Sequence, residues 1–184
     1  AGGSITSATA QAGQGGDITL LGREVGLFGN ARVDASGASG GGQVRVGGGL
    51  QGQDTRVPNA DSVYFGRDAQ IKADATVQGD GGRVILWSDH ATRAFGSLSA
   101  RGGVQGGDGG FIETSGGWLD ARPLAVDVGA AQGRAGQWLL DPYNITISDS
   151  ESDYGYDASF TATADSAQIN TATIAAALNA GTNV

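Results

Sequence analysis

The sequence predicts an all-β fold, a parallel β-helix with about 27 residues per coil and one short helix near the C-terminus. The main observation is a phrase of two glycines followed by a short apolar strand, whose second glycine stands at Gly16, Gly42, Gly82, Gly110 and, in a weaker copy, Gly136. The successive separations are 26, 40, 28 and 26 residues. A period in this range indicates stacked repeats, and the long interval fits one repeat with an insertion.

A second repeat, independent of the glycines, gives the same register. Ile5, Val33, Ile71, Leu98 and Val126 lie in short runs of alternating apolar and polar residues, separated by 28, 38, 27 and 28 residues. Alternation with a period of two predicts a strand. A third strand is expected around residues 27–28, 64–65 and 94–95. Three strands per repeat describe a coil of a parallel β-helix.

Stacking explains how such repeats fold. One coil has too little apolar surface to close a core, but coils stacked about 4.8 Å apart pair their backbones and bury a shared column of side chains. Glycine suits the corners between strands, because sharp turns often need a positive φ. The chain has 34 glycines among 184 residues, which is also typical of a disordered linker. The aligned apolar positions argue against disorder.

Composition excludes several classes of function. The net charge of −8 and the pI of about 4.4 disfavour nucleic acid as a partner. The absence of cysteine excludes disulfides, thiol catalysis and thiolate metal sites. No apolar run reaches the 18 or more residues of a membrane span, and a chain that begins at Ala1 is expected to be a mature or excised fragment.

Two regions follow from this pattern. Residues 1–147 are expected to form the β-helix coils, with an insertion at about 47–62 that is either a tolerated loop or a binding surface. Residues 148–184 form an acidic and aromatic segment with a short helix at about 171–179 and the start of a further strand at 182–184. Asn170 or Thr171 can cap the helix and Gly181 can end it, while Ile174, Ala177 and Leu178 share one face.

Several joined phrases resemble a known family. They are GGRVILWSD at 81–89, SARGG at 99–103, GGFIETSG at 109–116 and GQWLLDPYNITI at 136–147. The chain is similar to the filamentous-haemagglutinin-like and high-molecular-weight adhesins of Gram-negative bacteria. The resemblance implies a right-handed β-helix shaft, secreted by two-partner secretion through an outer-membrane transporter to the extracellular space or cell surface. Adhesion or biofilm formation is the implied role, against a host or neighbouring cell.

The Asn-Pro-Asn motifs of the family's export domain do not occur here, which favours a shaft region. We therefore expect a structural, non-enzymatic segment of an adhesin or fibre-forming exoprotein. One alternative is a self-assembling homopolymeric fibre subunit that stacks head to tail. Another is a carbohydrate-active β-helix enzyme, which needs clustered carboxylates or a carboxylate beside a base. Its candidate residues are Asp89, His90, Arg93, Glu113, Asp120 and Arg122, with Asp89, Glu113 and Asp141 about one coil apart.

The remaining candidate sites are binding sites rather than catalytic ones. Asp80 and Asp108 are 28 residues apart and could stack around a weak ion, although the nine-residue calcium repeat is absent, and no cofactor or metal is expected. Asn144 begins an Asn-Ile-Thr sequon and is a candidate glycosylation site, against the alternative that it lies inside a strand. An exposed ladder of aromatic rings would contact carbohydrate, and its candidates are Trp87, Trp118 and Trp138.

Overall fold

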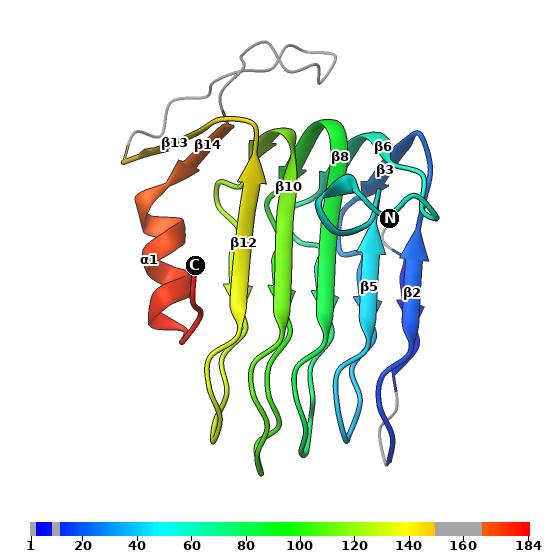
Figure 1. The fold of residues 1–184 in the computed structure, drawn as a ribbon, viewed down its shortest axis with the longest axis vertical. Coiled ribbons are helices and arrows are strands. Elements are labelled where there is room, and N and C mark those ends of the chain that lie inside the picture. The colour runs from blue at the N-terminus through cyan, green and yellow to red at the C-terminus, as the bar shows by residue number, and fades with distance from the viewer. Residues whose placement is uncertain (1–2, 9–11, 150–166) are drawn as a thin grey trace.

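The computed structural model describes residues 3–8, 12–149 and 167–184, and these residues form a parallel β-solenoid (Figure 1). The strands belong to two sheets. One has the order β1-β4-β7-β9-β11, and the other has the order β13-β14-β10-β8-β5-β2 with further pairs on its path. Every strand pair in the described part of the chain is parallel, and the strands from β1 to β12 pair with the equivalent strands of adjacent coils.

The strands that follow the glycine pairs stack in one column. They are β2 (Asp17–Leu20), β5 (Gln43–Val46), β8 (Arg83–Ala94), β10 (Phe111–Asp120) and β12 (Gln137–Pro142). Figure 1 shows these five strands side by side, and their first residues are direct partners from coil to coil. The register predicted from the glycines is therefore confirmed.

The second column also has the predicted register. It contains β1 (Ser4–Thr6), β4 (Arg32–Asp34), β7 (Gln70–Lys72), β9 (Ser97–Ser99) and β11 (Ala125–Asp127). Ile5 pairs with Val33, Val33 with Ile71, Ile71 with Leu98, and Leu98 with Val126. Four of these paired residues are at most 4% exposed and form one column of the core: Val33, Ile71, Leu98 and Val126.

The third side of each coil is built from β3 (Glu24–Leu27), β6 (Ala60–Phe65) and the second halves of β8 and β10. Leu27 pairs with Phe65, and Phe65 with Ala94, where the sequence predicts a third strand. β13 (Ile145–Ser148) and β14 (Ala167–Asn170) pair with each other, and Asp120 of β10 pairs with Gln168.

Glycine at the corners lets the coils approach closely. A Cβ atom built on Gly82 would lie 2.0 Å from the carbonyl oxygen of Gly42, and one on Gly110 would lie 2.1 Å from that of Gly82. Both contacts are with backbone atoms, which cannot move aside as a flexible side chain can. Neither glycine has a positive φ, so backbone conformation does not require glycine at these positions. What requires it is the close approach between coils.

The C-terminal helix α1 (Thr171–Asn179) packs beside β11 and β14. The Asn170 side chain accepts a hydrogen bond from the N–H of Ala172 at 2.7 Å, and Gly181 follows the helix with a φ of 81°. Ala177 is buried, but Leu178 is 53% exposed, so Leu178 does not belong to the buried face that the sequence predicts. No helix in the described residues is long and apolar enough to cross a membrane.

Candidate functional site

The most elaborate feature on the surface is a loop that we call the strap, residues 47–59. It joins β5 to β6 and contains a short 3₁₀ turn, η1 (Leu50–Gly52), whereas residues 21–23 make the same connection in the preceding coil. The strap lies over the outer face of the sheet, in front of β8 in Figure 1. β6 begins at Ala60, so residues 60–62 of the predicted insertion are strand rather than loop.

Glycines let the strap pack on the indole ring of Trp87. A Cβ atom on Gly52 would lie 2.4 Å from this ring, and one on Gly48 would lie 2.7 Å from it. Gly52 also has a φ of +64°, which favours glycine. Ile85 faces outward from β8, yet it is only 1% exposed. The strap therefore buries an apolar area on the outside of the solenoid.

Three carboxylates, one from each of three successive coils, hold the strap. Asp89 Oδ1 accepts hydrogen bonds from Asn59 Nδ2 at 2.8 Å and from Trp87 Nε1 at 3.1 Å. Both carboxylate oxygens of Glu113 accept from the backbone N–H of Gln51 at 3.1 Å, and Asp141 Oδ2 accepts from Gln51 Nε2 at 3.0 Å. The spacing of these acids in the sequence does bring them to one region, where they bind the loop.

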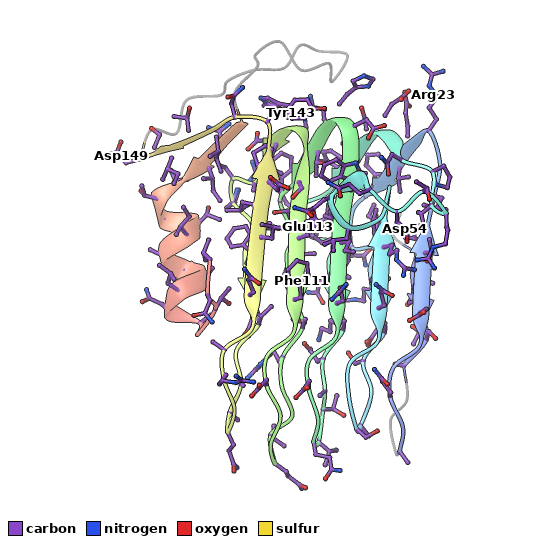
Figure 2. All side chains as sticks on the ribbon, in the orientation of Figure 1. Arg23, Asp54, Phe111, Glu113, Tyr143 and Asp149 are labelled. Carbon is purple, nitrogen blue, oxygen red and sulfur yellow. The ribbon has the colours of Figure 1, made fainter. Side chains whose placement is uncertain are left out.

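Glu113 is the most unusual of the three. It faces outward from β10 near the centre of the molecule (Figure 2), and it is 0% exposed. Burial raises the pKa of Glu113 above its ordinary value, and the nearby charge of Asp141 raises it further. Hydrogen bonds from Gln51 and Ser115 and the charge of Arg83 lower this pKa, but burial dominates.

The other acid and base candidates lie elsewhere and do not converge on this cluster. His90 is exposed, 3.9 Å from Asp61 Oδ1. Arg93 is buried with its guanidinium 5.5 Å from the centre of the Trp118 ring. Asp120 and Arg122 form an ion pair at 3.0 Å between largely buried side chains. The six candidates therefore fall into separate groups with different partners.

Asp80 and Asp108 stack in adjacent coils, but their oxygens hold protein groups. The N–H of Asp108 donates to Asp80 Oδ1 at 2.8 Å, and the Asp108 carboxylate accepts from the N–H and guanidinium of Arg134. These bonds from the backbone and side chain of Arg134 hold the pKa of Asp108 below its usual value. Among the described residues, no group of three or more His, Cys, Asp or Glu side chains is placed to hold a metal ion.

The three tryptophans do not form an exposed ladder. Trp118 and Trp138 are 2% and 1% exposed, and Trp87 is half-buried beneath the strap. They also occupy different columns, since Trp87 pairs with Ser115, Trp118 with Ala91 and Trp138 with Ile112. These residues therefore do not share one exposed surface, and carbohydrate contact by the half-buried Trp87 stays a prediction.

A different set of rings does stack on the surface. Phe28, Tyr64 and Phe95 come from three consecutive coils, and we call them the aromatic strip. The rings of Phe28 and Tyr64 are stacked with centres 5.0 Å apart, and Tyr64 meets Phe95 edge-on at 5.9 Å. Phe28 is 61% exposed, and the Arg67 guanidinium lies 5.5 Å from the centre of the Phe95 ring. All three residues lie where the sequence predicts a third strand. The recurrence of an aromatic residue at that strand is the sequence feature that could have indicated the strip.

Asn144 lies in the exposed bend between β12 and β13, beside Tyr143, which is 81% exposed. The sequon is therefore outside the strands at its asparagine, although Ile145 and Thr146 belong to β13. Most of the acidic and aromatic residues predicted for the segment after Ser148 lie outside the described residues. Near the C-terminus, the backbone carbonyl of Asn183 accepts a hydrogen bond from the N–H of Trp138 at 2.7 Å. Asn183 also forms a parallel bridge with Gln137, at the predicted start of a further strand.

Comparison with solved structures finds a neighbour with the same kind of fold. The chain is similar to the crystal structure of the HMW1 secretion domain from Haemophilus influenzae, with 31% sequence identity and a TM-score of 0.62. The similarity covers 77% of this chain and 36% of that one, so the chain spans about a third of the length of the structure that it matches. No family model and no curated protein matches the chain. The similarity connects this solenoid with the secretion domain of a two-partner secretion exoprotein.

Proposed function

We propose that this chain is a structural shaft segment of a secreted, adhesin-type exoprotein that reaches the extracellular side through an outer-membrane partner transporter. The similarity to the HMW1 secretion domain, at 31% identity over 77% of the chain, supports the exoprotein part of this proposal, and the shaft role rests on the stacked coils. The stacked register supports it, because each coil pairs its backbone with the next, so coils of the same kind can be added along the stack. The chain has no cysteine, so no disulfide forms before or after export.

The proposed role is not enzymatic. The carboxylates that came closest to a catalytic cluster hold the strap, and Glu113 is 0% exposed beneath it. A general acid or base must come within hydrogen-bond distance of a substrate. Glu113 reaches no substrate while the strap covers it, so the positions of these acids are better explained by attachment of the loop.

Secretion of a chimera tests the proposal. The stretch of the HMW1 secretion domain that aligns with this chain is replaced by this chain, and the amount released into the medium is compared with the amount retained in the cell. We expect release at a level within about threefold of the parent domain, because the coils match in fold. The matched control is the same chimera with Gly82→Val, a substitution that blocks coil stacking. We expect this control chimera to be retained in the cell. Equal retention of both chimeras would contradict the proposal.

Adhesion through the aromatic strip is the second part of this proposal. Exposed rings beside an arginine favour contact with carbohydrate or with another protein surface. Phe28 is largely exposed and needs no rearrangement to make such a contact. The strip also runs across three coils, so it presents a surface that no single repeat contains.

Binding to cultured epithelial cells and to an array of immobilised oligosaccharides tests the strip. Replacement of Phe28, Tyr64 and Phe95 by alanine should lower binding at least about tenfold, since three partly exposed rings together account for more than about 1.4 kcal/mol. The control replaces three exposed apolar residues elsewhere, Val77, Val104 and Tyr143, by alanine. If both triple variants bind like the parent chain, the strip has no role in adhesion.

A further inference from the structure

The strap is attached at points that come together only when several coils are stacked. It leaves the solenoid after Val46 of β5, yet it is bound by Asp89 after the first half of β8, by Glu113 of β10 and by Asp141 of β12. Gln51 makes two of these contacts, one through its backbone and one through its side chain. A single residue therefore links the strap to two further coils.

Closure requires an uncommon backbone conformation at Gln51. Its φ of 53° makes it the one non-glycine residue with a positive φ in the described part of the chain. This conformation aims its N–H at both carboxylate oxygens of Glu113. A non-glycine residue in the left-handed region is strained and persists only where its surroundings stabilise it. The contact with Glu113 is the clearest source of that stabilisation.

The environment of Glu113 depends on whether the strap is closed. With the strap in place, the carboxylate is removed from water and lies in the field of Asp141 from β12 and Arg83 from β8. The strap itself brings Asp54 and Arg56, which pair with each other, and β5 brings Arg45, which donates to Gln43. Opening of the strap removes Gln51 and lets water reach Glu113. Opening therefore removes both the burial, which raises the pKa of Glu113, and the Gln51 hydrogen bond, which lowers it. Because burial is the larger of these two effects, we infer that the carboxyl group holds a proton more tightly in the closed state.

We propose that the strap is a proton-linked closing device, fastened over Glu113 in mildly acidic surroundings and loosened as the pH rises. The linkage follows from the geometry, because a group that binds a proton more tightly in the closed state favours closure where protons are abundant. The direction of the pKa of Glu113 agrees with this sign. Opening would expose Ile85 and Trp87, an apolar area on the outer wall. This inference does not rest on the proposed secretion.

Hydrogen exchange of the whole chain, read by mass spectrometry between about pH 5 and pH 8 and corrected for intrinsic rates, tests the device. Peptides from the strap, 47–59, are compared with peptides from β10 beneath it. In the parent chain we expect the corrected opening of the strap to increase steadily as the pH rises across this range. In Glu113→Gln the slope should vanish, because the amide keeps the acceptor for Gln51 but does not titrate.

A second carboxylate serves as the control. The pKa of Asp74 is also raised by burial, but Asp74 accepts from Ser99 and from the N–H of Arg101, away from the strap. Asp74→Asn should therefore leave the pH dependence of strap exchange unchanged. Corrected strap exchange that does not vary with pH in the parent chain would overturn the proposal, and so would an equal slope in Glu113→Gln. The pH dependence of the parent chain is measured without any substitution, so that test does not depend on whether a variant folds.

Discussion

Replacement of Gly82 by alanine should unfold or severely destabilise the solenoid. The added methyl group would lie 2.0 Å from the Gly42 carbonyl oxygen and 2.7 Å from the Gly41 carbonyl carbon, and both are backbone atoms of the adjacent coil. The coils would have to separate at the middle of the stack, where β5, β8 and β10 pair. We expect a loss of at least about 3 kcal/mol in the free energy of unfolding, at or beyond the upper end for overpacked cores. Urea denaturation followed by circular dichroism measures it.

Gly22→Ala is the matched control for this experiment. Its methyl group would meet the Glu24 carbonyl oxygen at 3.4 Å and the Val25 side chain at 3.7 Å, which are ordinary contact distances. Gly22 is exposed and has no positive φ, so alanine there should change stability by no more than about 0.5 kcal/mol. A similar small effect at Gly82 would show that close approach at the corners is not what those glycines provide.

The columns of the solenoid could be predicted because stacking is a local rule repeated along the chain. The glycine corner and the apolar strand residue recur at the same position in every coil. The pairing of Ile5 with Val33, and of β2 with β5 after their glycine pairs, therefore follows from the spacing alone. Alternation with a period of two then separates inward from outward positions. The helix was also predictable, since Asn170 is a typical N-cap residue and Gly181 stands just beyond the helix.

The site was less predictable because its contacts cross many residues of sequence. The bond from Gln51 to Glu113 spans 62 residues, and the bond from Gln51 to Asp141 spans 90. Spacing by coil brought the acids together, but nothing in the sequence places a loop over them. The tryptophans were misjudged for two reasons. Trp138 belongs to the core, and for Trp118 the period-two alternation does not report what covers an outward position. Trp118 points outward in register with Ala91 and is nevertheless buried.

Truncation of Trp138 to alanine should cause the largest loss among the aromatic residues. The ring is 1% exposed, pairs in register with Ile112 of the preceding coil, and donates from Nε1 to Thr114 Oγ1 at 2.9 Å. Its removal leaves a cavity and takes the donor from a buried hydroxyl, so we expect a loss of about 3–5 kcal/mol. Because backbone pairing in a solenoid joins each coil mainly to the adjacent ones, the loss should appear first in β12 and α1.

Tyr143→Ala separates this effect from the loss of any aromatic ring in the last coil. Tyr143 stands just after β12 and is 81% exposed, as its outward position in Figure 2 shows, so its truncation should change stability by no more than about 0.5 kcal/mol. Chemical denaturation gives the two free energies, and hydrogen exchange gives the location. If the two variants lose equal stability, Trp138 does not anchor the core. If exchange rises uniformly in all coils, the solenoid unfolds as one cooperative unit rather than from its C-terminal coil.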